Sequence, residues 1–185
     1  MNEINNTIQK LREGKVILYP TDTIWGLGCS ALNEKAIDRI YTIKQRPQEK
    51  KLILLASSID MLQNYINEIP DKLIELIKDT SEPLSIIYSN ANNLPDRLLG
   101  PNKSIAIRIT KNTFCKDIIN GLGHPITSTS ANISGQAIAT SFKEIQKPIL
   151  KGVDYIVNLR QLEPSLSKTS KIARLDKDTI HFIRN

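Results

Sequence analysis

The sequence predicts a mixed α/β fold of the α+β type, with an open, twisted β-sheet flanked by helices. Short apolar runs that are typical of buried strands alternate with segments whose apolar residues recur at helical spacing. Two late apolar runs, residues 171–175 and 179–183, flank a turn in the manner of a hairpin, which indicates a mixed sheet. With 185 residues and no linker, the chain is expected to form one domain, residues 1–185.

The first half of the chain alternates helix and strand signals. Apolar residues at helical spacing begin at Ile4, and Gly14 is suited to end that helix. Asn33 is expected to cap a second helix, which runs out at residues 44–46, before Pro47. The expected order is helix 4–12, strand 15–19, loop 20–28, helix 33–46, strand 52–56, a helix capped by Ser57 or Ser58 that ends near residue 65, and helix 71–78.

The second half of the chain is richer in strand signals. Residues 84–88 and 105–109 contain the β-branched and aromatic side chains that suit a sheet. The expected order is strand 84–88, strand 105–109, helix 113–120, a short extended segment 125–128, a helix that begins within 141–146, strand 154–159, and the two strands of the late hairpin.

The charge of the chain favours polyanionic partners. Lys and Arg number 25 against 19 Asp and Glu, so the net charge is +6, and the pI is near 9.3. Such an excess suits nucleotides or nucleic acid and does not distinguish between them. Many small enzymes are mildly basic without a functional reason, so the charge alone does not decide the partner.

Cysteine and histidine usage gives no sign of a metal site. Cys29 and Cys115 lie far apart, form no Cys-x-x-Cys motif and are expected to be inert buried thiols. Neither His124 nor His181 has a further ligand at metal-binding spacing. The chain starts without the features of a signal peptide and has no apolar run of about 20 residues, so we expect a cytoplasmic protein without membrane contact.

A hydroxyl-rich segment and a basic segment are the most informative parts of the chain. Residues 125–135 (PITSTSANISG) place five hydroxyl side chains and a carboxamide between a proline and a glycine, a composition expected at the start of a loop. Residues 44–51 (KQRPQEKK) hold four cations at the predicted helix exit. Together these segments suggest a phosphate site in a basic concave cleft, although an isolated basic run is usually solvated surface.

The loop 20–28 (PTDTIWGLG) follows the first predicted strand directly. Its glycines allow close approach to a small ligand, although its hydroxyls could equally serve the backbone of a turn. The segment is not a GxxxxGK[ST] phosphate loop, and the chain contains no GxGxxG.

Arg108 is a cation within the apolar run 105–109. It either points to solvent or faces a cleft, where it would grip a carboxylate with two hydrogen bonds. The chain offers no Ser-His-Asp or Cys-His arrangement and no paired carboxylates at acid–base spacing, so we expect a site that binds and aligns charged substrates.

These residues resemble motifs of the threonylcarbamoyl-AMP synthase family, the YrdC-like domain. Residues 44–47 (KQRP) with 130–132 (SAN) resemble its KxR…SxN quartet, residues 20–26 its PT[DE]x…G loop, and residues 105–110 its Arg-bearing strand. Element order and length match over essentially the whole chain. The resemblance is to the short, single-domain bacterial form.

The resemblance implies a reaction and its partners. L-threonine, bicarbonate or CO2, and ATP would give threonylcarbamoyl-AMP and pyrophosphate. The product would serve the transferase machinery that modifies adenosine 37 in tRNAs reading codons that begin with A. Mg2+ is expected to arrive with ATP, without an assigned protein ligand.

The resemblance also implies site residues, none of them a certain catalytic group. The residues expected to bind ATP are Lys44, Arg46, Lys50, Ser104, Ser130, Asn132 and Arg184, with Lys44 and Arg46 aligning the substrate. The residues expected to bind threonine are Thr23, Arg108, Ser128 and Ser170. Ser170 and Arg184 come from the C-terminal part of the chain, where the match is loosest and residues 169–172 only loosely resemble the PST[IV] motif of the family.

The match has departures, and two other functions remain open. Trp25 replaces the usual Tyr or Phe, Lys51 stands where many members have Pro, and residues 82–85 (EPLS) depart from the usual PGPxT. The main alternative is a non-enzymatic module that binds tRNA or other double-stranded RNA through its positive charge. Carbamoyl transfer from another donor is a third possibility, but the chain lacks the accessory domains of such enzymes.

Overall fold

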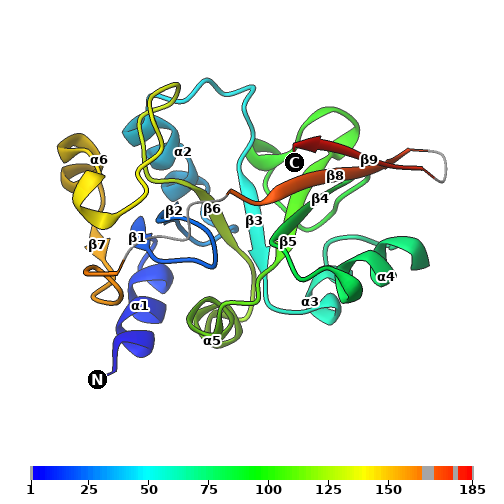
Figure 1. The fold of residues 1–185 in the computed structure, drawn as a ribbon, viewed down its shortest axis with the longest axis horizontal. Coiled ribbons are helices and arrows are strands. Elements are labelled where there is room, and N and C mark those ends of the chain that lie inside the picture. Colours follow the sequence, from blue (N-terminus) through cyan, green and yellow to red (C-terminus); the bar gives the residue numbers. More distant parts are fainter. Residues whose placement is uncertain (1, 164–168, 177–178, 185) are drawn as a thin grey trace.

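The computed structural model describes residues 2–163, 169–176 and 179–184. The strands in this part of the chain are β1 (Ile17–Tyr19), β2 (Gly26–Gly28), β3 (Ile53–Ala56), β4 (Leu84–Tyr88), β5 (Ile105–Ile109), β6 (Ile126–Ser130), β7 (Tyr155–Ile156), β8 (Lys171–Asp176) and β9 (Thr179–Arg184). They form one sheet in the order β7-β1-β2-β6-β3-β5-β4-β8-β9 (Figure 1).

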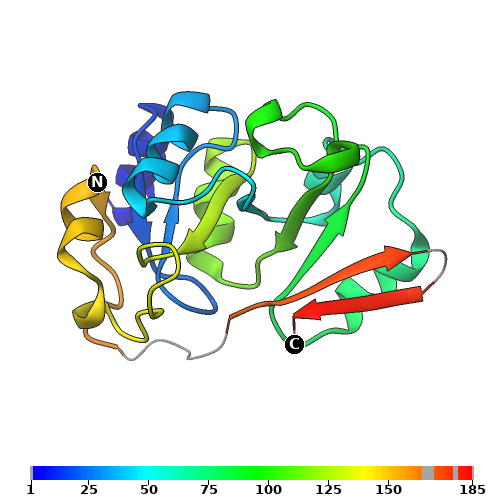
Figure 2. The ribbon, with the colours of Figure 1, turned by 90° about the horizontal axis from the view of Figure 1, so that it is seen from above.

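The predicted mixed sheet is confirmed. Strands β1 and β7, β3 and β5, and β4 and β8 pair in parallel, whereas the other neighbours pair antiparallel. The predicted late hairpin is β8 and β9, which Figure 2 shows as a long arm at one edge of the sheet. Because the two strands run in opposite directions, the end of β9 returns to the beginning of β8, and Arg184 lies opposite Ile172.

Helices flank this sheet, and all but the last lie close to their predicted places. They are α1 (Glu3–Arg12), α2 (Glu34–Lys44), α3 (Ile59–Gln63), α4 (Asp71–Asp79), α5 (Thr113–Leu122) and α6 (Lys147–Gly152), with 3-10 turns at Asp96–Leu98, Pro101–Lys103 and Phe142–Glu144. The side chain of Asn33 accepts a hydrogen bond from the Ala36 amide at 3.0 Å, as expected of an N-cap. Ser58, and not Ser57, caps α3 by accepting from the amide of Met61 at 3.1 Å.

Both faces of the sheet are buried, which follows from the alternation of side chains along a strand. In β3, Leu54 packs into a core with side chains of α2, α3 and α4, whereas Leu55 packs into a second core with α1 and α5. A third core lies around Trp25 and Leu27 beneath α6. Helices therefore cover the sheet on two sides, and they leave part of the Leu55 side open beyond α5.

One segment expected to be a loop is a strand, and another strand extends beyond its predicted end. Residues 26–28 form β2, which lies between β1 and β6. Glycine has a low strand propensity, so the sequence did not predict this strand. Glycine is nevertheless needed at position 28, because a Cβ there would lie 2.4 Å from the carbonyl oxygen of Thr127 and 2.8 Å from Cε1 of Tyr19. The hydroxyl-rich segment forms β6 and stays extended to Ser130, two residues beyond the expected end. The hydroxyl side chains disguise the strand because they do not give the alternation of apolar and polar residues that predicts one. Thr127 is nevertheless fully buried, and its hydroxyl accepts from the amide of Cys29 at 3.0 Å.

The region after the hydroxyl-rich segment also differs from the prediction. Residues 142–144 form a 3-10 turn, and the α-helix begins only at Lys147, with Pro148 in its first turn, where a missing amide hydrogen is harmless. The expected strand 154–159 shortens to Tyr155–Ile156.

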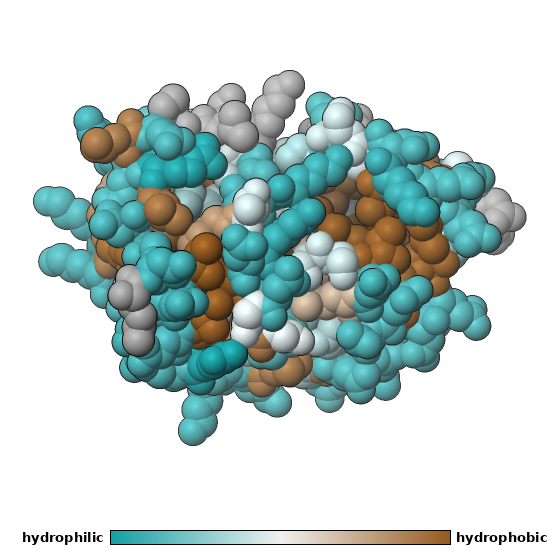
Figure 3. All heavy atoms as spheres, turned by 90° about the horizontal axis from the view of Figure 1, so that it is seen from below, coloured by the Kyte–Doolittle hydropathy of each residue, from teal (hydrophilic) through white to brown (hydrophobic). Residues whose placement is uncertain are grey.

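No helix in the described residues is long and apolar enough to cross a membrane. Figure 3 shows the face seen from below, where hydrophilic side chains dominate and hydrophobic ones surface in separate patches.

The close approach of β2 to its neighbours predicts the effect of a small substitution. Gly28→Ala should lower the free energy of unfolding by about 2–3 kcal/mol, because the new methyl group would overlap Thr127 and Tyr19. Gly26→Ala is the matched control, since its Cβ would meet its nearest atoms at an ordinary 3.4 Å. Urea denaturation of both variants measures the difference, and equal stabilities would contradict the packing described for β2.

Candidate functional site

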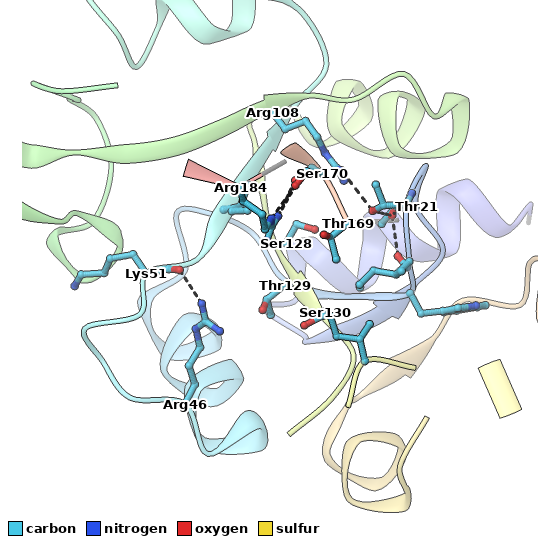
Figure 4. A pocket seen from close by; sticks show the side chains of 16 residues that line it. Thr21, Arg46, Lys51, Arg108, Ser128, Thr129, Ser130, Thr169, Ser170 and Arg184 are labelled. Atoms are coloured by element: carbon cyan, nitrogen blue, oxygen red, sulfur yellow. Dashed lines mark hydrogen bonds between the residues drawn. The ribbon is translucent and has the colours of Figure 1, made fainter. Parts of the chain in front are cut away.

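A pocket opens on the side of the sheet that carries Arg108. The space that it encloses, open solvent at its mouth included, is about 660 Å3. Its walls come from the segment after β1, the residues that follow α2, strands β3, β5 and β6, the two residues before β8, and the end of β9. The lining residues are Thr21, Thr23, Ile24, Trp25, Gly26, Arg46, Lys51, Ile53, Arg108, Ser128, Thr129, Ser130, Ile138, Thr169, Ser170 and Arg184 (Figure 4).

The pocket is built for an anion. Four basic residues line it, Arg46, Lys51, Arg108 and Arg184, and no Asp or Glu is among its described lining residues. Burial, and then the charge of Arg108, lowers the pKa of Arg184. In Figure 4, Arg46 and Lys51 lie on one side of the pocket and Thr21 on the other, with the β6 hydroxyls between them. The positive charge is therefore spread along an elongated site.

Arg108 faces this pocket and not solvent. Its side chain is 4% exposed, and its Nη2 lies 3.1 Å from Oδ1 of Asp22. Its Nη1 donates to Oγ1 of Thr23 at 3.4 Å. The buried Nε has no hydrogen-bond partner among the described residues, and neither has Asp22 Oδ1, which is close to Nη2 but poorly aligned with it. A buried guanidinium with a free N–H is a ready partner for a carboxylate.

Hydrogen bonds within the loop after β1 hold Thr23 beside Arg108. Oγ1 of Thr21 donates to the carbonyl of Ile24 at 2.8 Å and accepts from the amide of Thr23 at 3.0 Å. The hydroxyls of Thr21 and Thr23 lie 2.9 Å apart. The Thr-Asp-Thr sequence therefore serves two purposes, because Thr21 shapes the turn and Thr23 is presented to the pocket.

The C-terminal hairpin forms another wall. Nε and Nη2 of Arg184 donate to the carbonyl of Ser170 at 2.9 and 2.7 Å, and Nη2 lies 3.2 Å from its hydroxyl. The same hydroxyl lies 3.0 Å from Oγ of Ser85, a fully buried residue of β4. Ser85 belongs to the segment that departs from the family pattern, yet it anchors this wall to the sheet.

Arg46 is held at the exit of α2. Gln45 adopts the left-handed conformation with φ 49° and turns the chain out of the helix. Nε of Arg46 donates to the carbonyl of Lys50 at 2.7 Å, and Nη2 donates to that of Lys51 at 3.0 Å. Burial lowers the pKa of Arg46. The predicted basic turn therefore exists, and it fixes one guanidinium at the pocket.

Lys44 and Asn132 lie outside the pocket lining. Nζ of Lys44 donates to the carbonyls of Ser130 and Asn132 at 2.5 and 2.7 Å, and its side chain is almost fully buried. Burial, together with the nearby Arg46, lowers the pKa of Lys44 to about 7. Oγ of Ser130 donates to Oδ1 of Asn132 at 2.5 Å, and Nδ2 of Asn132 donates to the carbonyl of Gln136 at 2.7 Å.

The structure brings most of the expected site residues together. The lining includes all four expected threonine contacts, Thr23, Arg108, Ser128 and Ser170, and three of the expected ATP contacts, Arg46, Ser130 and Arg184. Four expected ATP contacts lie outside it: Lys44, Asn132, the exposed Lys50, and Ser104, which lies beside Gly100.

Sequence reasoning missed several lining residues. Thr129 was expected to be loop structure, and Lys51 was noted only as a departure from the family. Ile24, Trp25 and Ile138 add apolar surface. The adjacent Lys50 and Lys51 cannot be told apart from charge alone, and only the turn decides which one faces the pocket.

The two cysteines are not among the lining residues of the pocket. Cys29 and Cys115 are free and fully buried, as expected, and burial raises the pKa of each thiol to about 12. Neither is a thiolate near neutral pH. The described residues contain no cluster of three or more His, Cys, Asp or Glu that could hold a metal ion.

Comparison with known families identifies the relatives of this chain. A family model named for Sua5, YciO and YrdC, and described as telomere recombination, matches residues 9–185. The chain belongs to the Sua5/YciO/YrdC family. The match includes every element that lines the pocket.

Relatives of the Sua5/YciO/YrdC family agree in fold, and two named synthases also agree in length. The chain is 37% identical over 151 residues to a threonylcarbamoyl-AMP synthase of Pseudoalteromonas translucida, covering 80% of this chain and 81% of the relative. It is 33% identical to that of Vibrio parahaemolyticus, covering 100% and 99%. The crystal structure of P. abyssi Sua5 complexed with L-threonine superposes with a TM-score of 0.85 at 26% identity, covering 100% of this chain and 54% of that one.

Proposed function

We propose that this chain is a threonylcarbamoyl-AMP synthase. It would join L-threonine, bicarbonate or CO2, and ATP into threonylcarbamoyl-AMP, with release of pyrophosphate. The observation that carries the proposal is the buried Arg108, which lines a pocket with three further cations and whose Nε has no hydrogen-bond partner among the described residues. Relatives of similar length bear the name of this enzyme, and a structural relative was crystallised with L-threonine.

The end of the pocket around Arg108 suits threonine. The guanidinium would bind the carboxylate, and the hydroxyls of Thr23, Ser128 and Ser170 offer partners for the amine and the side-chain hydroxyl. Asp22 balances the charge of Arg108 without filling its hydrogen-bonding capacity.

The opposite end suits the triphosphate of ATP. Arg46 and Lys51 line that side, and Ser130 and Arg184 lie between the two ends. A cation about 4 Å from a phosphate oxygen contributes on the order of 4 kcal/mol at an effective dielectric near 20. Mg2+ would be held by phosphate oxygens, because the described lining offers cations and hydroxyls and no carboxylate.

The reaction needs alignment more than a protein nucleophile. The threonine amine takes up CO2 to form a carbamate, a step that releases water when bicarbonate is the source. A carbamate oxygen then attacks the α-phosphorus, and the bond to pyrophosphate breaks. Fixed cations would hold the two anions in line and offset the charge that develops on the leaving group.

The product would be passed to a tRNA threonylcarbamoyl transferase, which places the group on adenosine 37. Such a role puts the protein in the cytoplasm, with tRNA and ATP. Non-enzymatic RNA binding has less support, because the cations gather inside a pocket lined by buried hydroxyls and not along an open surface.

Omitting one substrate at a time tests the function. Pyrophosphate release should require ATP, threonine and bicarbonate together, and omission of either co-substrate should reduce it to background. A coupled pyrophosphate assay with mass spectrometry of the adenylate measures this. Release that persists without threonine would contradict the proposal.

Arg108→Lys tests the threonine end. A lysine keeps the charge but loses the planar donor pair, so the KM for threonine should rise about tenfold or more while the KM for ATP changes less than about threefold. Steady-state kinetics with each substrate varied in turn separates the two. An equal change in both constants would mean that Arg108 does not act at threonine.

Arg46→Ala tests the phosphate end. The KM for ATP should rise at least about tenfold, because a cation fixed at the pocket is lost. Arg39→Ala is the matched control, since Arg39 lies on α2 and pairs with Asp154 away from the pocket. If both variants changed the ATP kinetics equally, the pocket assignment of Arg46 would be wrong.

A further inference from the structure

Lys44 contacts the turn after β6 at three points. Its Nζ donates to the carbonyls of Ser130 and Asn132 at 2.5 and 2.7 Å. Its own carbonyl accepts from the amide of Ser134 at 2.8 Å. One residue at the end of α2 therefore closes the turn 130–134 through side chain and backbone together.

The peptide groups that Lys44 contacts are fixed at both ends. The peptide that begins at Ser130 presents its amide, on Ala131, to the carbonyl of Trp25 at 3.0 Å. The peptide that begins at Asn132 presents its amide, on Ile133, to Oε1 of Gln146 at 3.3 Å. The carbonyl of Ser130 also accepts from the amide of Asn132 at 3.0 Å, whereas the carbonyl of Asn132 accepts from Lys44. Without Lys44, the carbonyl of Asn132 would lose this donor in a buried place, which disfavours this turn.

The Lys44 amine also offsets the negative potential of the two carbonyl oxygens. Two carbonyl oxygens converge directly behind Ser130, and their partial negative charges would repel an anion in the pocket. The Lys44 amine lies between them, with an exposed fraction of 1% and no ion pair to any described Asp or Glu. Two of its three hydrogens are donated to these carbonyls, and the side chain is almost fully buried, so the amine is little accessible to a phosphate in the pocket.

We propose that Lys44 is a positioning residue, which clamps the turn after β6 so that Ser130 faces the pocket, and that it does not contact phosphate directly. The part that concerns phosphate rests on the proposed function. In the KxR…SxN quartet, Arg46 and Ser130 then face the ligand, whereas Lys44 and Asn132 hold the turn behind them.

Wild-type protein with 15N-labelled lysine and arginine provides the first test. The clamp predicts a slowly exchanging Nζ signal for Lys44 without ligand, which shifts little on addition of ATP or inorganic pyrophosphate, while the Nε signal of Arg46 shifts clearly. A Lys44 signal that moves as much as that of Arg46 would overturn the proposal.

Two variants provide the second test. In Lys44→Met the amides of Ala131 and Ser134 should exchange at least about tenfold faster, with those of Leu55 and Ala56 unchanged, and ATP affinity should fall about tenfold while threonine affinity stays within about threefold. In Arg46→Met, ATP affinity should fall while the same amides keep their exchange rates.

The outcomes separate the clamp from a direct contact and from the function itself. Weaker ATP binding in Lys44→Met with unchanged amide exchange would mean a direct contact and would refute the clamp. If wild-type protein bound no ATP, the proposed function would fail, yet the exchange rates would still decide on the clamp. If Lys44→Met did not fold, the labelled wild-type protein would decide.

Discussion

The pairing of β6 with both β2 and β3 is the constraint on which the rest of the molecule depends. This strand joins β1, β2 and β7 to the larger set of strands that begins at β3. Its register places Ser130 opposite Gly26 and Ser128 opposite Ile53. A shift by one residue would turn these hydroxyls to the opposite face of the sheet and bury them in an apolar core. Sheet integrity and pocket chemistry are therefore set by the same hydrogen bonds.

The cations of the pocket are held mainly by backbone oxygens. Arg108 has the carboxylate of Asp22, but Arg46, Arg184 and Lys51 donate to carbonyls. A carbonyl orients a cation without cancelling its charge, whereas a carboxylate would neutralise it. Burial without neutralisation disfavours the charged form in the empty protein, which is why the pKa values of Arg46 and Arg184 are lowered. It leaves most of the attraction available for an anionic ligand.

Most helices, most strands and most pocket residues could be predicted from the sequence, because the patterns that predict them depend on interactions between residues close together along the chain. Helix caps such as Asn33, and apolar runs such as residues 105–109, act through neighbours along the chain. The strand at Gly26–Gly28 left no such signal, since its reason is the space beside Tyr19. The side to which Arg108 points, and the choice of Lys51 over Lys50, depend on how distant segments meet. The motif predicted that Lys44 binds phosphate, but a motif does not say which atoms the Lys44 amine contacts.

The walls of the pocket come from strand pairs that are remote along the chain, and this has a consequence for folding. Tyr19 and Gly26 are near neighbours, but Gly26 pairs with Ser130 and Leu84 with Lys171. Folding rates fall as the sequence separation of contacts grows, because long loops must close before such contacts form. A partly folded chain has no complete pocket, so substrates can bind only after the last long-range strands have paired. Ligand binding then shifts the folding equilibrium toward the fully paired sheet by mass action.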